Sequence, residues 1–257
     1  MPEFCKVESE GRVLVVTINR PEVMNSLHPP ASFELAKVFD EFAADPELWV
    51  AILTGAGERA FSAGNDLKYT AAGGKFELPP TGFAGLTQRF DNWKPIIAAV
   101  NGVALGGGFE IALACDLIIA AEEASFALPE PRVGLAALAG GLHRLPRQIP
   151  LKQAMGIILT GRRVSAQEAQ ELGLVNEIVP RTELIAAARR WADQILECAP
   201  LSVRGSKQAA LQGLDHASFE EAQSTRYEGL GAMVRSEDFR EGPRAFVEKR
   251  PPRWQGK

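Results

Sequence analysis

The sequence has few of the residues that build disulfide frameworks or metal sites. It contains three cysteines and three histidines in 257 residues. The cysteines, Cys5, Cys115 and Cys198, lie far apart, form no CxxC pair and show no histidine spacing typical of a metal site. We therefore expect reduced thiols, as in a cytosolic protein, and no bound metal.

A long apolar run and an excess of positive charge are also missing. No apolar stretch approaches the roughly 20 residues that a transmembrane helix needs. The N-terminal segment MPEFCKVESEGR lacks the apolar centre of a secretory signal. The formal net charge is -4, and no run of lysine or arginine suggests binding to nucleic acid or to an anionic membrane. We expect a cytoplasmic protein whose partner is a small molecule or another protein, not nucleic acid or a membrane.

Short strand-like runs alternate with helical patterns over most of the chain. The β-branched runs lie at 12–20, 49–55, 95–100 and 116–121. Such alternation is typical of α/β folds. Regular spacing of Phe33, Ala36 and Phe39 predicts a helix over 32–44, and a second helix is predicted near 85–93.

Helical patterns dominate after about residue 150, apart from a strand-like run at 175–179. Ser165 to Glu168 and Ser218 to Glu221 fit capping boxes, and Gly173 stands where a helix would end. We predict an α/β core over 1–196 and a helical C-terminal segment over 197–257. A segment of that size buries too little surface to be stable alone, so it should pack on the core or on a neighbouring subunit.

Three consecutive glycines occur in the segment NGVALGGGFE, residues 101–110. Gly106 to Gly108 follow a strand-like run and precede an apolar helical pattern, where each glycine costs roughly 0.5–1 kcal/mol relative to alanine. One explanation is close packing of the helix start on a strand. The other is a ligand that approaches the unpaired backbone N–H groups of the first turn. The spacing is not the dinucleotide fingerprint GxGxxG, and the triplet alone leaves both explanations open.

A second glycine turn, Ala63-Gly64-Asn65, follows the strand-like run at 49–55. A backbone N–H group from this turn could point into the same crevice as the glycine triplet. Two such donors aimed at one thioester oxygen would form an oxyanion hole, in which each donor contributes on the order of 3 kcal/mol to the transition state. Neither donor needs a particular side chain, which fits the glycines and small residues found here.

These segments belong to a larger set of motifs, and the sequence resembles the crotonase (enoyl-CoA hydratase/isomerase) family over nearly its whole length. The matching motifs, in order, are Asn19-Arg-Pro21 with Asn25, FSAGNDLK at 61–68, NGVALGGGFE, Cys115-Asp116, Phe126-Ala-Leu-Pro-Glu130, Gly140-Gly141 with Arg144-Leu145, Leu159-Thr-Gly161 and Ala245-Phe-Val-Glu-Lys-Arg250. The resemblance implies a spiral of ββα turns, and a C-terminal helical region that builds homotrimers or dimers of trimers. It also implies acyl-CoA thioester substrates, whose coenzyme A is part of the substrate rather than a separate cofactor.

By this resemblance, the backbone N–H groups of Asn65 and Gly107 hold the thioester enolate. Glu110 and Glu130 match the paired glutamates of the hydratases, in which one activates a water for attack at Cβ and the other supplies the proton at Cα. Taken without the resemblance, Glu110 is most simply an exposed helix residue and Glu130 a solvated loop residue.

The resemblance also places four residues near the nucleotide of coenzyme A. Ala63 and Leu67 would contact the adenine, and Lys68 could approach a phosphate. Phe246, from this or a neighbouring subunit, could close over the nucleotide. The alternatives are a solvated surface lysine for Lys68 and a core side chain for Phe246.

The paired glutamates favour an enoyl-CoA hydratase that adds water reversibly to a 2-enoyl-CoA. One departure leaves other reactions open: Ala137 and Leu138 replace the proline and first glycine of a family segment resembling IPGAGG, and a leucine there should narrow or dry the corner that holds the water. An isomerase, a carnitinyl-CoA-type dehydratase and a hydratase-lyase remain alternatives. A non-catalytic RNA-binding or scaffold relative is disfavoured, because no helix face is rich in lysine.

Overall fold

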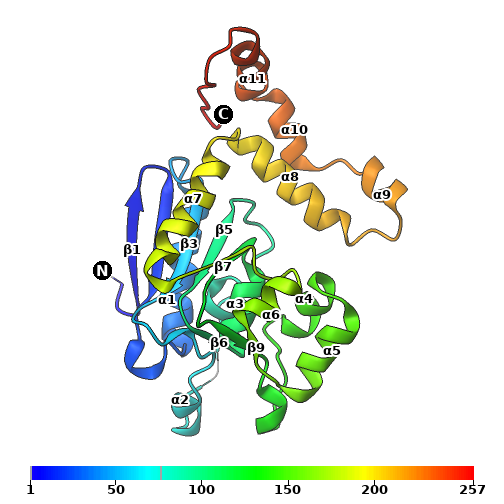
Figure 1. Ribbon diagram of the computed structural model, residues 1–257. Coiled ribbons are helices and arrows are strands. Elements are labelled where there is room, and N and C mark those ends of the chain that lie inside the picture. Colours follow the sequence, from blue (N-terminus) through cyan, green and yellow to red (C-terminus); the bar gives the residue numbers. More distant parts are fainter. Residues whose placement is uncertain (1, 76) are drawn as a thin grey trace.

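The computed structural model describes residues 2–75 and 77–257 (Figure 1). The strands are β1 (Cys5–Glu10), β2 (Val13–Ile18), β3 (Val50–Gly55), β4 (Ala60–Ser62), β5 (Ile96–Val100), β6 (Val103–Leu105), β7 (Leu117–Ala121), β8 (Ser125–Ala127), β9 (Val164–Ser165) and β10 (Glu177–Val179). The α-helices are α1 (Pro29–Ala44), α2 (Leu67–Ala71), α3 (Gly107–Ala114), α4 (Gly141–Gln148), α5 (Leu151–Thr160), α6 (Ala166–Glu171), α7 (Leu184–Leu196), α8 (Pro200–Gly213), α9 (Phe219–Ser224), α10 (Glu228–Arg235) and α11 (Asp238–Val247). Short 3-10 helices are η1 (Pro21–Val23), η2 (Phe83–Gly85), η3 (Glu130–Val133) and η4 (Arg181–Glu183).

The strands form two sheets, and the chain alternates between them. The larger sheet has the order β1-β2-β3-β5-β7-β10, and the smaller has the order β4-β6-β8-β9. The successive pairs β3/β4, β5/β6 and β7/β8 each give one strand to each sheet, and within each sheet these strands are parallel. The chain therefore winds as a spiral, which confirms the predicted α/β class and spiral arrangement.

The larger sheet is covered on both faces, which is why its central strands are almost wholly apolar. Along β3, Ala51 and Leu53 pack in the cluster that contains α1 and the smaller sheet, whereas Val50 and Ile52 pack in the cluster that contains α7. Every residue of β3 and β5 is buried. The strand-like runs predicted from the sequence owe their continuous apolar character to this two-sided burial.

The helix predicted over 32–44 begins earlier, at Pro29, where a proline at the first positions of a helix loses no hydrogen bond. The helix predicted near 85–93 is wrong. Only the short η2 is found there, with Gly85 at φ +68° and Ala84 at φ +55°. A Cβ on Gly85 would overlap the backbone of Ala36 in α1, so close packing between distant segments determines this conformation.

The two predicted capping boxes are half formed. The Ser165 and Ser218 side chains accept hydrogen bonds from the N–H groups of Glu168 and Glu221, at 3.1 and 3.2 Å. The Glu168 carboxylate instead forms an ion pair with Arg162. The Glu221 carboxylate accepts from the Ala217 N–H group at 3.1 Å, one residue before the capping serine. Each serine therefore caps its helix, but neither glutamate accepts from the N–H group of its own serine.

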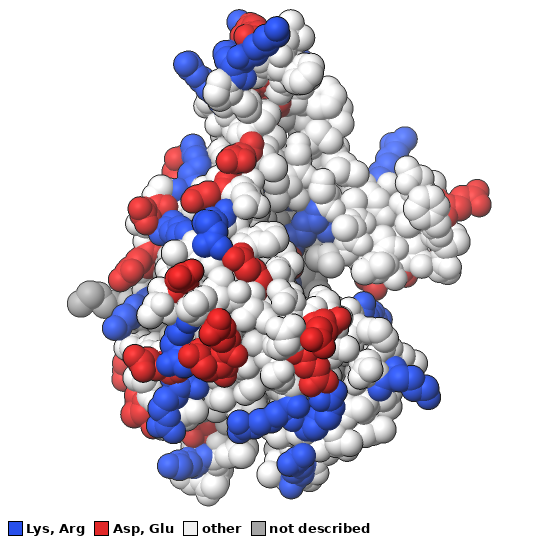
Figure 2. Space-filling model, viewed as in Figure 1, with Lys and Arg blue, Asp and Glu red and all other residues white. Residues whose placement is uncertain are grey.

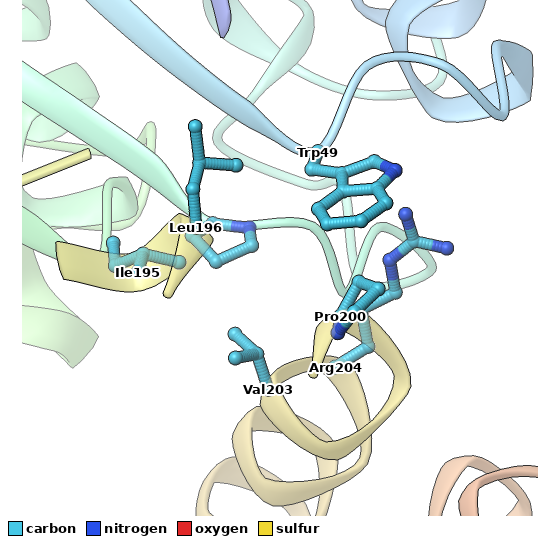
Figure 3. A pocket seen from close by; sticks show the side chains of 7 residues that line it. Trp49, Ile195, Leu196, Pro200, Val203 and Arg204 are labelled. Atoms are coloured by element: carbon cyan, nitrogen blue, oxygen red, sulfur yellow. The ribbon is translucent and has the colours of Figure 1, made fainter. Parts of the chain in front are cut away.

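Helices α8 to α11 extend away from the two sheets beyond the end of α7 (Figure 1). At the junction, Trp49, Ile195, Leu196, Pro200, Val203 and Arg204 surround a small pocket (Figure 3). The Lys207 ammonium in α8 binds the Asp116 carboxylate at 2.8 Å and thereby ties this helix to the larger sheet. The division of the chain at residue 196 stays a prediction.

The surface carries charges of both signs. On the face shown in Figure 2, lysine and arginine side chains lie among aspartate and glutamate side chains rather than forming one continuous basic region. Within residues 2–75 and 77–257, no helix combines the length and apolar character that crossing a membrane requires. Cys5, Cys115 and Cys198 are free cysteines.

Candidate active site

The two glycine turns lie directly against one another. Gly64 has φ +84°, and a Cβ added to it would lie 2.6 Å from the carbonyl oxygen of Leu105 and 2.7 Å from the backbone nitrogen of Gly107. A Cβ on Gly108 would overlap the carbonyl of Ser62. The triplet therefore does serve close packing, and this packing brings the turn after β4 to the start of α3.

Two backbone N–H groups at this junction are not used by the secondary structure. Leu27 donates to the Gly64 carbonyl at 2.7 Å and accepts from Asp66 at 2.9 Å, so Asn65, between them, directs its own N–H group away from this bridge. Gly107 is the first residue of α3, where an N–H group has no partner within the helix. Among the backbone hydrogen bonds that turns and loops form in the described part of the chain, none is donated by the N–H group of Asn65 or of Gly107. Both remain able to bind an oxygen of a ligand.

A buried ion pair holds the Asn65 turn in place. The Arg20 guanidinium lies 3.1 Å from the Asp66 carboxylate, and both side chains are largely buried. Asp66 also caps α2 by accepting from the Tyr69 N–H group at 3.2 Å. The sequence showed Arg20 within a motif but assigned it no role, because its partner lies 46 residues further along the chain.

Glu110 lies in the first turn of α3 and is 3% exposed. Its Oε1 accepts a hydrogen bond from the Gly141 N–H group at 2.8 Å, at the start of α4. Burial raises the pKa of Glu110 to about 7; the charge of Glu130 adds to the rise, while the Gly141 hydrogen bond and Arg144 oppose it. The interpretation of Glu110 as an exposed helix residue is wrong, because its side chain is buried and lies against Gly141 at the start of α4.

Glu130 begins η3 and lies beside the glycine triplet. A Cβ on Gly106 would be 2.8 Å from its Oε1. Its Oε2 is buried and has no hydrogen-bond partner among the described residues, and burial raises the pKa of this carboxyl. Glu130 is therefore not a solvated loop residue. The structure brings together Glu110, Glu130 and the Gly107 amide, next to the Asn65 turn.

The segment that departs from the hydratase pattern combines a buried and an exposed residue. Ala137 is 2% exposed and lies near Gly141, whereas Leu138 is 80% exposed. The Leu138 side chain therefore makes few contacts with the rest of its own chain. Ala137 and the Glu110 side chain both lie against Gly141, and narrowing of this corner by Leu138 stays a prediction.

The residues predicted to contact coenzyme A do not all come together. Ala63 is partly buried at the turn, and Leu67 and Lys68 are exposed on the adjoining helix α2. Phe246, 85% exposed, lies on α11, at the opposite end of the molecule from α2 (Figure 1). Phe246 is thus not a core residue of this chain, and within one chain it does not approach the other three. Contact of these residues with coenzyme A stays a prediction.

The buried carboxyl of Glu110 predicts a pH-dependent stability difference. Its folded pKa of about 7 lies above the ordinary value of 4.5, so folding favours the protonated form. This stabilisation is complete below pH 4.5 and is lost as the pH rises through about 7. The glutamine of Glu110→Gln stays neutral at every pH. We therefore expect the free energy of unfolding of this variant to exceed that of the native chain by up to about 3 kcal/mol at pH 8 and to differ little from it at acidic pH.

Urea unfolding of both proteins at pH 5 and pH 8 measures this difference. The exposed Glu122→Gln is the matched control, and its unfolding curve should follow the native chain at both pH values. An equal effect of Glu110→Gln at the two pH values would contradict the raised pKa.

Comparison with known proteins agrees with this geometry. A family model described as "Enoyl-CoA hydratase/isomerase" matches residues 8–257. A carnitinyl-CoA dehydratase of Salmonella typhi is 45% identical over 270 residues, covering 100% of both chains. Among solved structures, an enoyl-CoA hydratase from Mycobacterium tuberculosis H37Rv matches with TM-score 0.93 and 40% identity over 99% of both chains. A carnitinyl-CoA hydratase from Mycobacterium avium matches with TM-score 0.80 and 41% identity over 100% of both. The chain belongs to the enoyl-CoA hydratase/isomerase, or crotonase, family.

Proposed function

We propose that this protein is an acyl-CoA hydratase/dehydratase, which adds water reversibly across the double bond of a 2-enoyl-CoA. The observation that carries the proposal is the pair of carboxyl groups of the buried Glu110 and the partly buried Glu130, next to the Gly107 amide and the Asn65 turn. Both family membership and the names of similar proteins support an acyl-CoA substrate.

The two amides would bind the thioester carbonyl oxygen. When water attacks Cβ, negative charge moves onto this oxygen and forms an enolate. Donors fixed by the backbone stabilise that charge without reorganising, and each contributes on the order of 3 kcal/mol. The ion pair of Arg20 with Asp66 and the start of α3 hold the donors of Asn65 and Gly107 in place.

The carboxyl pair would move the two protons of the reaction. One carboxylate removes a proton from the attacking water, and the other carboxylic acid gives a proton to Cα. A carboxyl group with a pKa of about 7, as for Glu110, can accept or donate a proton near neutral pH. Neighbouring carboxyl groups that repel one another favour the singly protonated pair that this step needs. No separate cofactor is proposed, because water addition is acid–base chemistry without electron transfer.

A panel of thioesters tests the proposal. We expect the purified protein to remove the conjugated thioester absorbance of crotonyl-CoA or of a longer or branched 2-enoyl-CoA. In water enriched in heavy oxygen the product should carry the label. A product with a moved double bond and no label would instead indicate an isomerase, and absence of turnover on every thioester would remove the hydratase proposal.

A carnitinyl-CoA dehydratase is the second candidate. It is favoured by the 45% identity to proteins of that name over the full length of both chains. The chemistry is the same elimination of water, but the acyl group carries a quaternary ammonium. The panel should therefore include, beside crotonyl-CoA, the 2-enoyl-CoA whose acyl group carries the quaternary ammonium. A kcat/KM at least tenfold higher for the charged substrate would select this candidate, and the reverse would exclude it.

We also propose that the chain assembles as a homotrimer or a dimer of trimers. Several large apolar side chains of the C-terminal helices are exposed, namely Phe219, Val234, Phe246 and Val247. The proposal requires that these side chains, together with the helices that carry them, are covered by a neighbouring subunit, because large apolar surfaces that join into one patch mark subunit interfaces. A neighbouring subunit at these helices would also be the means to bring Phe246 to the nucleotide.

A further inference from the structure

Arg144 lies beside the catalytic candidates without a function assigned to it by the sequence. It is in the first part of α4, near Gly140 and Gly141. Its guanidinium packs on Gly140, which has φ +107°, so closely that an added Cβ would overlap Nη1. The adjoining Gly141 N–H group is the donor to Glu110. Arg144 therefore covers the turn that anchors the Glu110 carboxylate.

The same guanidinium also reaches the segment over Gly107. Arg144 Nη2 donates to the carbonyl oxygen of Thr87 at 2.9 Å. The Thr87 hydroxyl in turn accepts from the Phe83 N–H group at 2.9 Å. The Phe83 ring lies against Gly107, where a Cβ would be 2.6 Å from the ring. Arg144 thus connects the Glu110 anchor with the ring that covers the Gly107 donor.

The charge of Arg144 acts on the same site. No ion pair with a carboxylate is found for it within residues 2–75 and 77–257. The charged or titratable groups that affect Glu110 are Glu130, which raises its pKa, and Arg144, which lowers it. Arg144 also interacts with the thiol of Cys115, whose pKa is raised by burial. The positive charge of Arg144 therefore stabilises the carboxylate form of Glu110.

We propose that Arg144 is a positioning residue that holds the Gly140-Gly141 turn and the segment from Phe83 to Thr87 against each other, so that Glu110 and the Gly107 amide keep one relative arrangement. The consequence for rate rests on the proposed function, because it assumes that these two groups act on one thioester. The consequence for the Glu110 carboxyl does not depend on any substrate.

Three variants test the proposal. Arg144→Gln removes the charge and shortens the side chain, Arg144→Lys restores the charge without the planar guanidinium, and Arg147→Gln is the matched control on the exposed side of α4. We expect Arg144→Gln to lower kcat by about 100-fold, since small displacements of reacting groups have effects of that size, with KM changed much less. Arg144→Lys should recover only part of kcat, and Arg147→Gln should match the native chain.

The protonation of Glu110 is the second measurement, made by carbon-13 NMR of labelled glutamate carboxyls and assigned by the loss of the signal in Glu110→Gln. Loss of the Arg144 cation disfavours the carboxylate, so the titration midpoint should move to higher pH by about half a unit or more in Arg144→Gln. It should return toward the native value in Arg144→Lys. Thermal unfolding shows which variants are folded, and the lysine variant keeps the test available should the glutamine variant unfold.

The two proposals fail in different ways. A native chain that hydrates no thioester, but whose Glu110 titration moves in Arg144→Gln, would remove the hydratase and retain the role of Arg144. Native kcat and an unmoved midpoint in Arg144→Gln, as in Arg147→Gln, would overturn the role of Arg144 and retain the hydratase.

Discussion

Glu130→Gln is expected to lower turnover by several orders of magnitude while binding of the coenzyme A part stays nearly unchanged. The substitution keeps the size of the side chain but removes its ability to gain or lose a proton. Glu130 lies against Gly106, and its buried Oε2 has no hydrogen-bond partner among the described residues. Because the reaction moves two protons and Glu110 carries one of them, the loss of Glu130 leaves the other proton without a carrier. Loss of an essential proton-transfer group typically costs about 10²–10⁴ in rate.

The measurement compares kcat and KM on the best thioester of the panel, together with the affinity for free coenzyme A by calorimetry. Glu122→Gln is the matched control, because Glu122 is exposed in the turn before β8, eight residues before Glu130 in the sequence. It should retain native values for all three quantities. Near-native turnover of Glu130→Gln would disprove the role proposed for this carboxyl group.

The parts of the fold that were predicted from the sequence are those with strong local patterns. The strands β3, β5 and β7 are runs of apolar residues buried on both faces, and α1 shows helical spacing on its buried face. Strand β1 was missed because its sequence, CKVESE, is mostly charged or polar and only Cys5 is buried. The three-residue strands β4, β6 and β8 are too short for a period of two to be recognised.

The site was predictable only in part, because a sequence shows local patterns but not contacts between distant segments. The local sequence showed the glycine turns and, by resemblance, the two glutamates. The contact of Glu110 with Gly141 spans 31 residues and that of Arg144 with Thr87 spans 57, and neither leaves a local pattern. The predicted helix near 85–93 failed because the conformation around Gly85 is fixed by packing on α1. Contacts between distant segments therefore determine both the missed residues and the wrong helix.

Gly64→Ala is expected to lower turnover by about 100-fold or more. The new Cβ would lie 2.6 Å from the Leu105 carbonyl and 2.7 Å from the Gly107 nitrogen. Both are backbone atoms, which cannot move aside as the end of a flexible side chain can. The turn that carries Asn65 must then shift away from the start of α3, and the two amides no longer reach one oxygen. Removing a single oxyanion donor costs about 10²–10³ in kcat.

The positive φ of Gly64 would by itself strain an alanine, and the control must separate this strain from the lost geometry. Gly173 provides it, because it has the same φ of +84° with nothing within 4 Å of an added Cβ. Gly173→Ala should lose about 1–2 kcal/mol of stability from the left-handed conformation and keep native turnover. Gly64→Ala should lose turnover at temperatures where it is still folded. Equal turnover of the two variants would mean that contact between the two turns does not set the rate, and that the thioester oxygen is held elsewhere.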